Sequence, residues 1–423
     1  MTRSETPAAG PASRRIVVAG GGAGGLELAA RLAGARIPGA EVLLIDRRPT
    51  HVWKPRLHEV AVGSIARDEL VYREHAHRHG YGFLLGEIAA VDTDARRLTL
   101  APLASRRTRA VLRPETTVPY DVLVLAVGSR TNDFGIPGVL EHAFRLDGPD
   151  EAADLQRALV EATQRPDPHT RVTIVGAGAT GVELAAELHY AFDVLGRFGI
   201  GGTLATTLVD GAPRVMPMLD PAGSARIEAW LGAAGVELLL SARVAAVEAG
   251  AVRLADGRAI ASDLTVWASG VTGADLLTAI PGLSLGRGRR IEIDDRLRCK
   301  GVEGVLALGD CAAAADGGAL PPTAQVAHQQ ASYLGRALPE MLAGRTPPPF
   351  RFHPKGVLVD LGHEEAVGEL GSRRLGVHGA LPRLAFAALE QAHRTTLYGG
   401  GRAAALWAAD RLRGLALPPL KLH

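Results

Sequence analysis

The chain has 423 residues, of which 47% are hydrophobic and 22% are charged, enough for two or three domains with buried cores. A formal net charge of +2 provides no overall field for gripping nucleic acid, so we expect no nucleic-acid partner. The two cysteines, Cys299 and Cys311, are too few for a disulfide framework and lack the spacing of a redox dithiol. We therefore expect two buried thiols in an intracellular protein.

The N-terminus and the hydrophobic runs limit how the chain can meet a membrane. Residues 1–14 lack the apolar core of a signal peptide, and we interpret them as a disordered leader. No stretch of the sequence reaches the roughly 18 apolar residues of a membrane span. We therefore expect a peripheral protein without a transmembrane helix, which meets a membrane from one side only.

The first organised stretch, residues 16–46, has the pattern of a dinucleotide-binding βαβ unit. An apolar run leads into glycines in G-x-G-x-x-G spacing, an Ala/Leu-rich segment and a second apolar run that ends at Asp46. Gly20 would allow the tight turn, Gly22 a close approach of a pyrophosphate, and Gly25 close packing of helix on strand. The helix N-terminus would offer free N–H groups to the phosphates, and Asp46 would accept hydrogen bonds from a ribose.

A segment rich in aromatic, basic and proline residues follows at residues 50–60, without strand or helix periodicity. We interpret it as a loop. It is either an ordinary surface loop or a loop folded over a bound cofactor, with Lys54 and Pro55 near the phosphates or the ring. Residues 82–100 then alternate like a strand hairpin, with apolar strands at residues 83–85, 88–91 and 98–100 and a turn at residues 92–94. Residues 120–127 are typical of a buried parallel strand, which Gly128 closes.

The pattern then restarts at residue 171. Gly176, Gly178 and Gly181 repeat the G-x-G-x-x-G spacing, and a helix and a strand that ends at Asp210 follow. A hairpin and a closing apolar strand at residues 264–270 complete the copy. This internal repeat predicts two nucleotide sites that face each other.

A third buried strand ends in Gly309 and Asp310, and we expect it to return the chain to the first domain. Two prolines precede a helix predicted over residues 323–342. Gln325 and Gln329 lie one turn apart on this helix, so their amides face the same way. Two such glutamines are commonly just solvated, but beside a cofactor they would hydrogen-bond a carbonyl-bearing ring.

The C-terminal region is basic and amphipathic. One side of the predicted helix at residues 381–392 is apolar, the glycines at 399–401 interrupt it, and an Ala/Leu/Trp segment follows at 402–412. From residue 371 to residue 423, eight Lys and Arg residues stand against two acids. This combination favours a helix lying on an anionic membrane surface. The alternative is an ordinary helix that packs on the domain or on a homodimer partner.

Together these motifs make the chain resemble the type II NADH:quinone oxidoreductases, the single-subunit respiratory NADH dehydrogenases, over nearly all of residues 15–423. The segments that carry the resemblance are HVWKPRLHEV (51–60) with the following Gly63-Ser64, GAGATGVEL (176–184), WASG (267–270), GDC (309–311), AQVAHQ (324–329) and LKLH (420–423). One departure is Asp210, which stands where many members carry Glu.

The resemblance implies an α/β fold with two Rossmann-type dinucleotide-binding domains and C-terminal amphipathic membrane-associated helices. The FAD-binding domain would comprise residues 15–149 and 291–375, and the NADH-binding domain residues 150–290. Residues 376–423 would form the membrane-association region.

The resemblance also implies a role for each candidate residue. FAD would be held by the first glycine turn and by later segments of the same domain, namely by Gly20, Gly22, Gly25, Asp46, Lys54, Pro55, Gly128, Gly309, Asp310, Ala324 and Gln325. NADH would be held by Gly176, Gly178, Gly181 and Asp210. The quinone would reach the flavin through Gln325 and Gln329, and Glu183 matches the family's glutamate near the nicotinamide.

The implied reaction passes a hydride from NADH to FAD and two electrons on to a membrane quinone, menaquinone or ubiquinone, without proton pumping or a metal. It would take place on the cytoplasmic face of the inner membrane. Two other interpretations stay open. A sulfide:quinone reductase shares the architecture but needs a cysteine pair beside the flavin, and Cys299 and Cys311 lie in the wrong part of the chain for that. A non-catalytic flavin- or nucleotide-binding protein on the membrane is the non-enzyme alternative.

Overall fold

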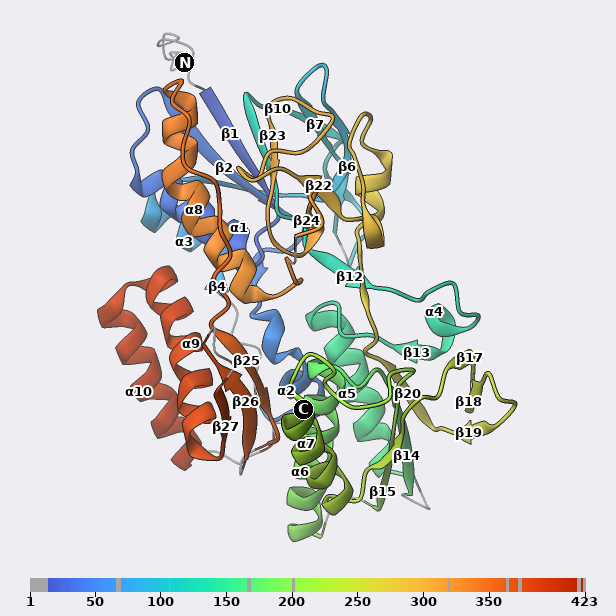
Figure 1. The fold of residues 1–423 in the computed structure, drawn as a ribbon. Helices are drawn as coiled ribbons and strands as arrows, with labels where there is room; N and C mark the ends of the chain where they lie inside the picture. The colour runs from blue at the N-terminus through green and yellow to red at the C-terminus, as the bar shows by residue number, and fades with distance from the viewer. Residues whose placement is uncertain are drawn as a thin grey trace. The chain divides into compact units, whose positions relative to one another are not determined.

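The computed structural model describes residues 14–65, 70–105, 107–165, 169–199, 202–318, 320–362, 365–371, 375–416 and 420. Of the predicted leader, only Arg14 is among them. The chain forms two compact units, coloured along the chain in Figure 1. Unit 1 comprises Met1–His51, Glu69–Ser129 and Thr272–Phe352, and unit 2 comprises Val52–Asp68, Arg130–Val271 and His353–His423.

Unit 1 is built on a five-stranded sheet in which all neighbouring strands are parallel. Its strands, in spatial order, are β23 (Val305–Ala307), β11 (Val122–Leu125), β1 (Arg14–Ala19), β2 (Ala40–Asp46) and β5 (Gly82–Leu85). The central strands read as continuous apolar runs because both faces of the sheet are buried: all four residues of β11 and the last four of β1 are buried. Helices α1 (Ala23–Gly34) and α8 (Ala324–Leu342) lie side by side in this unit (Figure 1).

Unit 2 repeats this arrangement. Its five parallel strands, in spatial order, are β13 (Ala143–Phe144), β20 (Leu264–Trp267), β14 (Thr170–Val175), β15 (Leu204–Val209) and β16 (Glu237–Leu239). The order β20-β14-β15-β16 matches β11-β1-β2-β5 strand for strand, so the predicted internal repeat is confirmed. Only the origin of the outermost strand differs. It comes late in the chain in unit 1 and early in unit 2.

Small antiparallel sheets and bridges complete both units. In unit 1 they are β3 (Thr50–His51) with β4 (Leu70–Val71), β6 (Ile88–Asp92) with β7 (Arg97–Leu100) and β10 (Thr116–Pro119), and β8 (Leu103–Ala104) with β9 (Val111–Arg113). The short strands β22 (Ile291–Ile293) and β24 (Ala312–Ala314) pair in parallel. In unit 2 they are β17 (Val244–Glu248), β18 (Ala251–Leu254) and β19 (Ala259–Ala261), and then β25 (Gly356–Asp360), β26 (Ala366–Leu370) and β27 (Leu375–His378). The chain passes between the units at β12 (Ser129–Thr131) and β21 (Val271–Gly273).

The remaining helices divide between the units. Unit 1 holds α3 (Tyr72–His79) and the 3-10 helices η2 (Asp275–Ala279), η3 (Arg287–Arg289) and η4 (Gly309–Cys311). Unit 2 holds η1 (Lys54–Arg56), α2 (Leu57–Val62), α4 (Val139–His142), α5 (Pro149–Thr163), α6 (Ala179–Arg197), α7 (Pro221–Ala233), α9 (Ala380–Tyr398) and α10 (Gly400–Ala416). Among the described residues, none of the helices is both long and apolar enough to span a bilayer.

The predicted hairpin is confirmed for residues 88–100, where β6 and β7 form an antiparallel pair, while β5 pairs with β2 at the edge of the main sheet. One prediction about local structure is wrong. The predicted loop at residues 50–60 contains β3, η1 and most of α2. Leu57, Val60 and Ala61 bury one face of α2 against α5 and α6. This face covers less than two turns, too short to stand out among prolines and aromatic residues.

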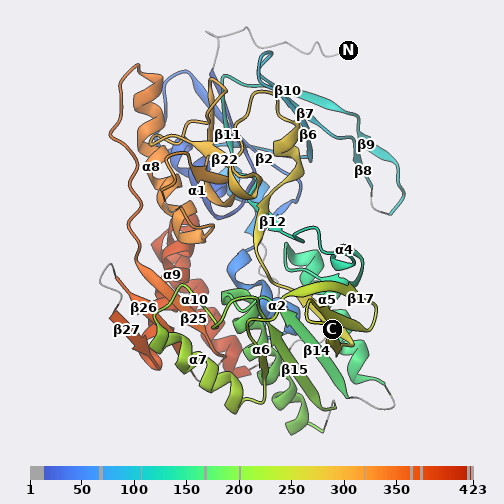
Figure 2. The ribbon, with the colours of Figure 1, turned by 45° about the vertical axis from the view of Figure 1, so that its right-hand side comes forward.

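The compact units also begin and end at other residues than the expected domains. Residues 353–375 belong to unit 2, where β25 packs on α6 and β26 on α7 (Figure 2). The physical reason is apolar burial, since Val359, Leu361 and Val367 join the hydrophobic core of unit 2.

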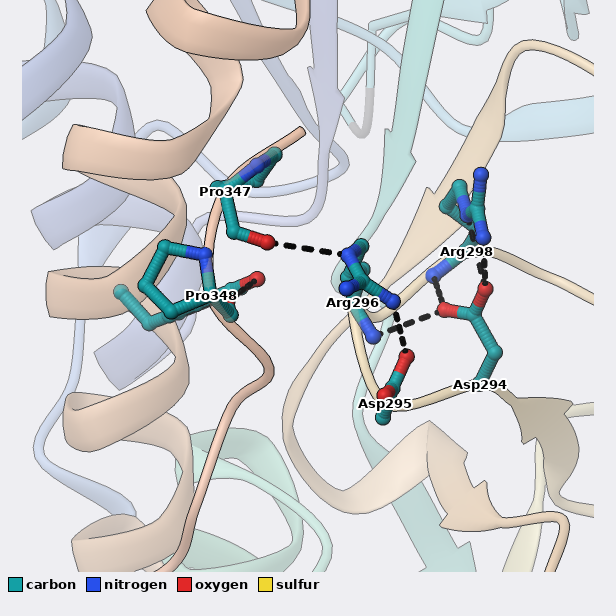
Figure 3. A network of polar contacts seen from close by, with 7 residues as sticks. Asp294, Asp295, Arg296, Arg298, Pro347 and Pro348 are labelled. Atoms are coloured by element: carbon teal, nitrogen blue, oxygen red, sulfur yellow. Dashed lines mark hydrogen bonds and ion pairs between the residues drawn. The ribbon is translucent and has the colours of Figure 1, made fainter. Parts of the chain in front are cut away.

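The polar network in Figure 3 holds the last segment of unit 1, which follows α8. The Asp294 carboxylate accepts hydrogen bonds from the backbone N–H groups of Arg296 and Arg298, at 2.8 and 2.9 Å. Arg296 Nε donates in turn to the carbonyl of Pro347 at 3.0 Å. The segment that follows α8 is thereby held by side chains and backbone of the same unit.

Candidate functional site

The structure requires glycine at the first and last positions of both nucleotide-binding turns. Gly20 and Gly176 have φ angles of 106° and 114°, which only glycine adopts without strain. A Cβ on Gly25 would lie 1.9 Å from the carbonyl oxygen of Gly20, and a Cβ on Gly181 would lie 1.9 Å from that of Gly176. Strand, turn and helix therefore pack too closely for any side chain at these positions.

The middle glycines, in contrast, border open space. A Cβ on Gly22 or Gly178 would meet no atom of the described residues within 4 Å. These glycines are the N-caps of α1 and α6, and neither helix has a side-chain cap. The first N–H groups of each helix, with the positive end of its dipole, are thus available to an anion. Both turns fit the pyrophosphate of a dinucleotide.

Asp46 and Asp210 end the strands next to these turns and are held in the same way. The Asp46 carboxylate accepts hydrogen bonds from the backbone N–H groups of Gly21 at 2.6 Å and Arg48 at 2.8 Å. The Asp210 carboxylate accepts one from Ala177 at 2.6 Å and one from a second backbone N–H at 2.7 Å. Burial raises the pKa of Asp46. Each carboxylate keeps further lone pairs for ribose hydroxyls.

The turn after β23 contains Gly309 and Asp310, which the sequence analysis identified. It is bound by Gln330, which the sequence analysis missed. Asp310 accepts a hydrogen bond from Ser129 Oγ at 3.0 Å, and its backbone carbonyl accepts one from Arg290 Nε at 2.9 Å. The backbone N–H of Gly309 donates to Gln330 Oε1 at 2.7 Å, and Gln330 is fully buried. Within the described part of the chain, Gln330 Nε2 has no hydrogen-bond partner, which leaves a buried donor for a bound group.

Gln325 and Gln329 lie on α8 of unit 1, and both are half-buried. Ala324 is the first residue of this helix, and Thr323 caps it by accepting a hydrogen bond from the backbone N–H of Val326. Gln330 occupies the buried face of the same helix. The only sequence signal for it was its place directly after Gln329.

Glu183 is buried in a cluster that sequence analysis did not foresee. Its Oε2 lies 3.6 Å from His58 Nδ1, and its Oε1 accepts a hydrogen bond from the backbone N–H of Asp360 at 3.3 Å. Glu187, one turn later, accepts a hydrogen bond from Ser64 Oγ at 2.6 Å. Burial raises the pKa of Glu183 well above its usual range and that of Glu187 to about 7, and it lowers the pKa of His58 to about 4. Burial therefore favours the neutral forms of Glu183 and His58 over an ion pair between them.

The candidate residues thus fall into two groups, one in each unit. Unit 1 contains Gly20, Gly22, Gly25, Asp46, Gly128, Gly309, Asp310, Ala324, Gln325 and Gln329. Unit 2 contains Lys54, Pro55, Gly176, Gly178, Gly181, Glu183 and Asp210. Lys54 and Pro55 belong to η1, which precedes α2.

Both cysteines are buried free thiols, as predicted. Cys311 Sγ donates to the carbonyl oxygens of Leu308 at 3.2 Å and Leu125 at 3.5 Å. Burial raises the pKa of Cys311 to about 12 and that of Cys299 well above its usual range. Neither thiol has the thiolate character of a redox nucleophile.

Comparisons with known proteins agree with this geometry. The family model described as pyridine nucleotide-disulphide oxidoreductase matches residues 14–331, which defines the class of the fold. The type II NADH:quinone oxidoreductase of Haemophilus influenzae is 32% identical over 444 residues, which cover 97% of this chain and 100% of that protein. The enzyme of the same name from Staphylococcus aureus is 27% identical over 84% of this chain and 89% of that protein. The chain therefore belongs to the type II NADH:quinone oxidoreductase family.

Solved structures share the α/β fold. NDH2 from Plasmodium falciparum in complex with NADH superimposes with a TM-score of 0.79 at 17% identity, covering 91% of this chain and 97% of that one. The sulfide:quinone oxidoreductase from Aquifex aeolicus gives a TM-score of 0.75 at 17% identity, covering 92% of each chain. At these identities the likeness concerns the fold alone. The predicted α/β class is confirmed.

Proposed function

We propose that this protein uses FAD to oxidise NADH and to reduce a membrane quinone, without pumping protons. The observation that carries the proposal is the 32% identity to a type II NADH:quinone oxidoreductase over its full length, together with two intact glycine turns. When bound, FAD supplies the chemistry that accepts a hydride and releases two electrons. The protein supplies binding, alignment and proton exchange.

We assign FAD to unit 1. The N–H groups at the start of α1 would bind its pyrophosphate, and Asp46 would bind its ribose. Gly128 and the turn at Gly309 and Asp310 would border the rest of the molecule. Gln330 Nε2, which has no partner among the described residues, supports this assignment, because leaving a buried donor without an acceptor costs free energy. The family resemblance adds Lys54, Pro55, Ala324 and Gln325 to this site.

We assign NADH to unit 2, where Gly176, Gly178 and Gly181 form the turn that begins α6. Asp210 would accept hydrogen bonds from the ribose hydroxyls and repel a 2′-phosphate. Its two backbone donors hold it in place. A carboxylate opposite a phosphate is unfavourable because like charges repel, so we expect NADH to be preferred over NADPH.

For the quinone we assign Gln325 and Gln329 of α8, whose amides would orient the quinone carbonyls. Quinone reduction consumes two protons as well as two electrons. Glu183 is the residue to which we assign proton exchange, because its carboxyl group is buried and its pKa is raised. The two thiols are buried and protonated, which argues against a sulfide:quinone reductase.

The C-terminal helices would hold the protein on the cytoplasmic face of the inner membrane. Leu406, Trp407 and Leu412 on α10 expose 38%, 46% and 67% of their surface, which suits the interfacial region of a bilayer. Basic residues on the same helix, such as Arg402 and Arg411, would meet anionic lipids. Flotation with anionic vesicles tests this assignment. A dimer that does not float would favour a homodimer partner instead.

Flavin absorbance under anaerobic conditions tests the proposed reaction. NADH should bleach the flavin band of the purified protein, and menaquinone or ubiquinone should restore it, whereas sulfide should not bleach it. In a Gln325→Ala/Gln329→Ala double variant loaded with FAD, NADH should still bleach the flavin, but reoxidation by quinone should be roughly tenfold slower. Gln164→Ala, at an exposed position in unit 2, is the control. If NADH fails to bleach the flavin band, the proposed oxidoreductase activity is refuted. If quinone reoxidises the flavin of the double variant as fast as that of the wild type, the two glutamines do not belong to the quinone site.

A further inference from the structure

Gly21, the residue in the middle of the first glycine turn, is held through both of the peptide groups that it joins. The backbone N–H of Gly21 donates to Asp46. Its carbonyl oxygen accepts two hydrogen bonds, from His51 Nδ1 at 2.9 Å and from Tyr72 Oη at 2.7 Å. The two donors come from β3 and from the start of α3, so separate segments converge on one oxygen.

Both donors are fixed in place. His51 is 5% exposed and Tyr72 is 3% exposed. The Tyr72 ring packs directly on the turn, since a Cβ on Gly21 would lie 2.5 Å from it, and it also packs against Phe83 with ring centroids 5.2 Å apart. A carbonyl oxygen can only accept, so the proton of the imidazole is assigned to Nδ1. Burial lowers the pKa of His51 to about 4 and raises that of Tyr72, so both groups are neutral at physiological pH.

The planarity of the peptide bond connects this arrangement to the ligand. In a trans peptide the carbonyl and the following N–H point in opposite directions. Pinning the carbonyl of Gly21 therefore aims the N–H of Gly22 away from His51 and Tyr72. Gly22 is the N-cap of α1 and borders open space, which is where the anion would bind.

We infer that His51 and Tyr72 are positioning residues for the pyrophosphate of FAD, because they orient the Gly21–Gly22 peptide so that Gly22 N–H faces the phosphate. The inference rests on the proposed function, in which FAD binds this turn. The two residues act through the backbone and touch no reacting atom. They give the FAD turn its binding geometry before the ligand arrives.

The second turn supports this role independently. The carbonyl of Ala177, at the position of Gly21, accepts a hydrogen bond from the backbone N–H of Met216 at 2.8 Å. Unrelated groups thus hold the same peptide in both turns. Because different donors bind this carbonyl in the two turns, the feature that matters is the orientation of the peptide rather than general packing around the turn.

The test measures the affinity of apoprotein for FAD by fluorescence quenching. Tyr72→Phe keeps the ring and removes one donor, and we expect the dissociation constant to rise roughly 3- to 10-fold, the usual worth of one hydrogen bond. His51→Phe removes the other donor and should act in the same direction. The control is Tyr333→Phe, which removes a part-buried hydroxyl that donates to the Pro348 carbonyl at 2.8 Å in the same unit.

Thermal unfolding of the apoproteins separates positioning from packing. Tyr72→Phe and Tyr333→Phe should lower the unfolding temperature similarly, while only Tyr72→Phe and His51→Phe should weaken FAD binding. Wild-type affinity in both turn variants, or an equal loss in Tyr333→Phe, would overturn the inference and leave the proposed function intact. A wild-type apoprotein that binds no FAD would overturn both. If Tyr72→Phe does not fold, His51→Phe decides the question by the same measurement.

Discussion

Helices α1 and α6 begin with the same glycine turn and carry a glutamate at the same place, each beside a histidine, but only the first glutamate also has an arginine one turn later. In unit 1, Glu27 is fully buried, and its carboxylate accepts hydrogen bonds from Arg31 Nε and His328 Nδ1, both at 2.7 Å. In unit 2 the residue one turn after Glu183 is Glu187, an acid. The first glutamate links α1 to α8, whereas burial raises the pKa of the second and so favours its protonated form. The glutamate of the repeated motif thus joins two helices in unit 1, a contact that we call the Glu27 lock. In unit 2 it is a candidate proton carrier.

The two turns differ in a second respect. Side chains hold the middle peptide of the first turn, whereas a backbone N–H holds that of the second. Met216, the donor, has a φ of 45°, an unfavourable angle for a residue with a side chain. A backbone donor survives most substitutions and a side-chain donor does not. The FAD turn should therefore be the more sensitive of the two to mutation of its surroundings.

The largest effect is expected at the last glycine of the turn, where both units pack helix against strand without room for a side chain. In Gly25→Ala the new Cβ would lie 1.9 Å from the Gly20 carbonyl oxygen, so strand and helix must separate. We expect FAD affinity to fall roughly 10- to 100-fold, and the protein to be purified with little flavin. The measurement is flavin absorbance per chain. Gly34→Ala on the same helix, where a Cβ meets nothing within 4 Å, should keep its flavin, and a yellow Gly25→Ala protein would contradict the account.

The next effect tests the lock in unit 1. Arg31→Glu makes α1 resemble α6 by placing an acid one turn after a buried glutamate. We expect the free energy of unfolding to fall by about 2–4 kcal/mol, because the Glu27 carboxylate loses a charged donor. Urea denaturation measures it. The control is Arg197→Glu, which breaks an exposed pair with Asp193 and should cost less than about 1 kcal/mol. Equal losses in the two variants would show that Glu27 is not a lock.

The smallest effect concerns Glu187. Its pKa is raised from 4.5 to about 7 in the folded protein, so between these pH values the folded protein holds a proton that the unfolded chain releases. The free energy of unfolding should therefore fall as the pH rises through this window, by about 1–3 kcal/mol in total, and stay lower above it. Glu187→Gln should remove this loss. At pH 8 it should be more stable than the wild type, and at pH 4.5 the advantage should vanish. Glu161→Gln, at an exposed position on α5, should leave the pH dependence unchanged.

The sequence predicted the two repeats well because their signals are local. Glycine spacing and buried apolar runs fix turn and strand without reference to the rest of the chain, and the helix at residues 323–342 was placed within one residue of α8. The C-terminal helices were also predicted, though α9 and α10 extend beyond the expected limits.

What the sequence could not show depends on partners far away in the chain. Tyr72 reaches the carbonyl of Gly21 across 51 residues, and Gln330 reaches the backbone of Gly309 across 21. Tertiary burial decides which of the two units residues 353–375 join, and the local hydrophobic periodicity of the sequence does not indicate it. Glu183 was identified by family resemblance, but its raised pKa depends on burial that only the structure reveals.

The central claim is that each glycine turn serves one nucleotide, FAD in unit 1 and NADH in unit 2. Stopped-flow flavin absorbance after mixing with NADH tests it directly in Gly181→Ala, with Gly196→Ala on the same helix as the control, since a Cβ there meets nothing within 4 Å. We expect Gly181→Ala to keep its flavin but to be bleached at least about tenfold more slowly than wild type at limiting NADH. A Gly181→Ala protein that is bleached as fast as wild type would contradict it.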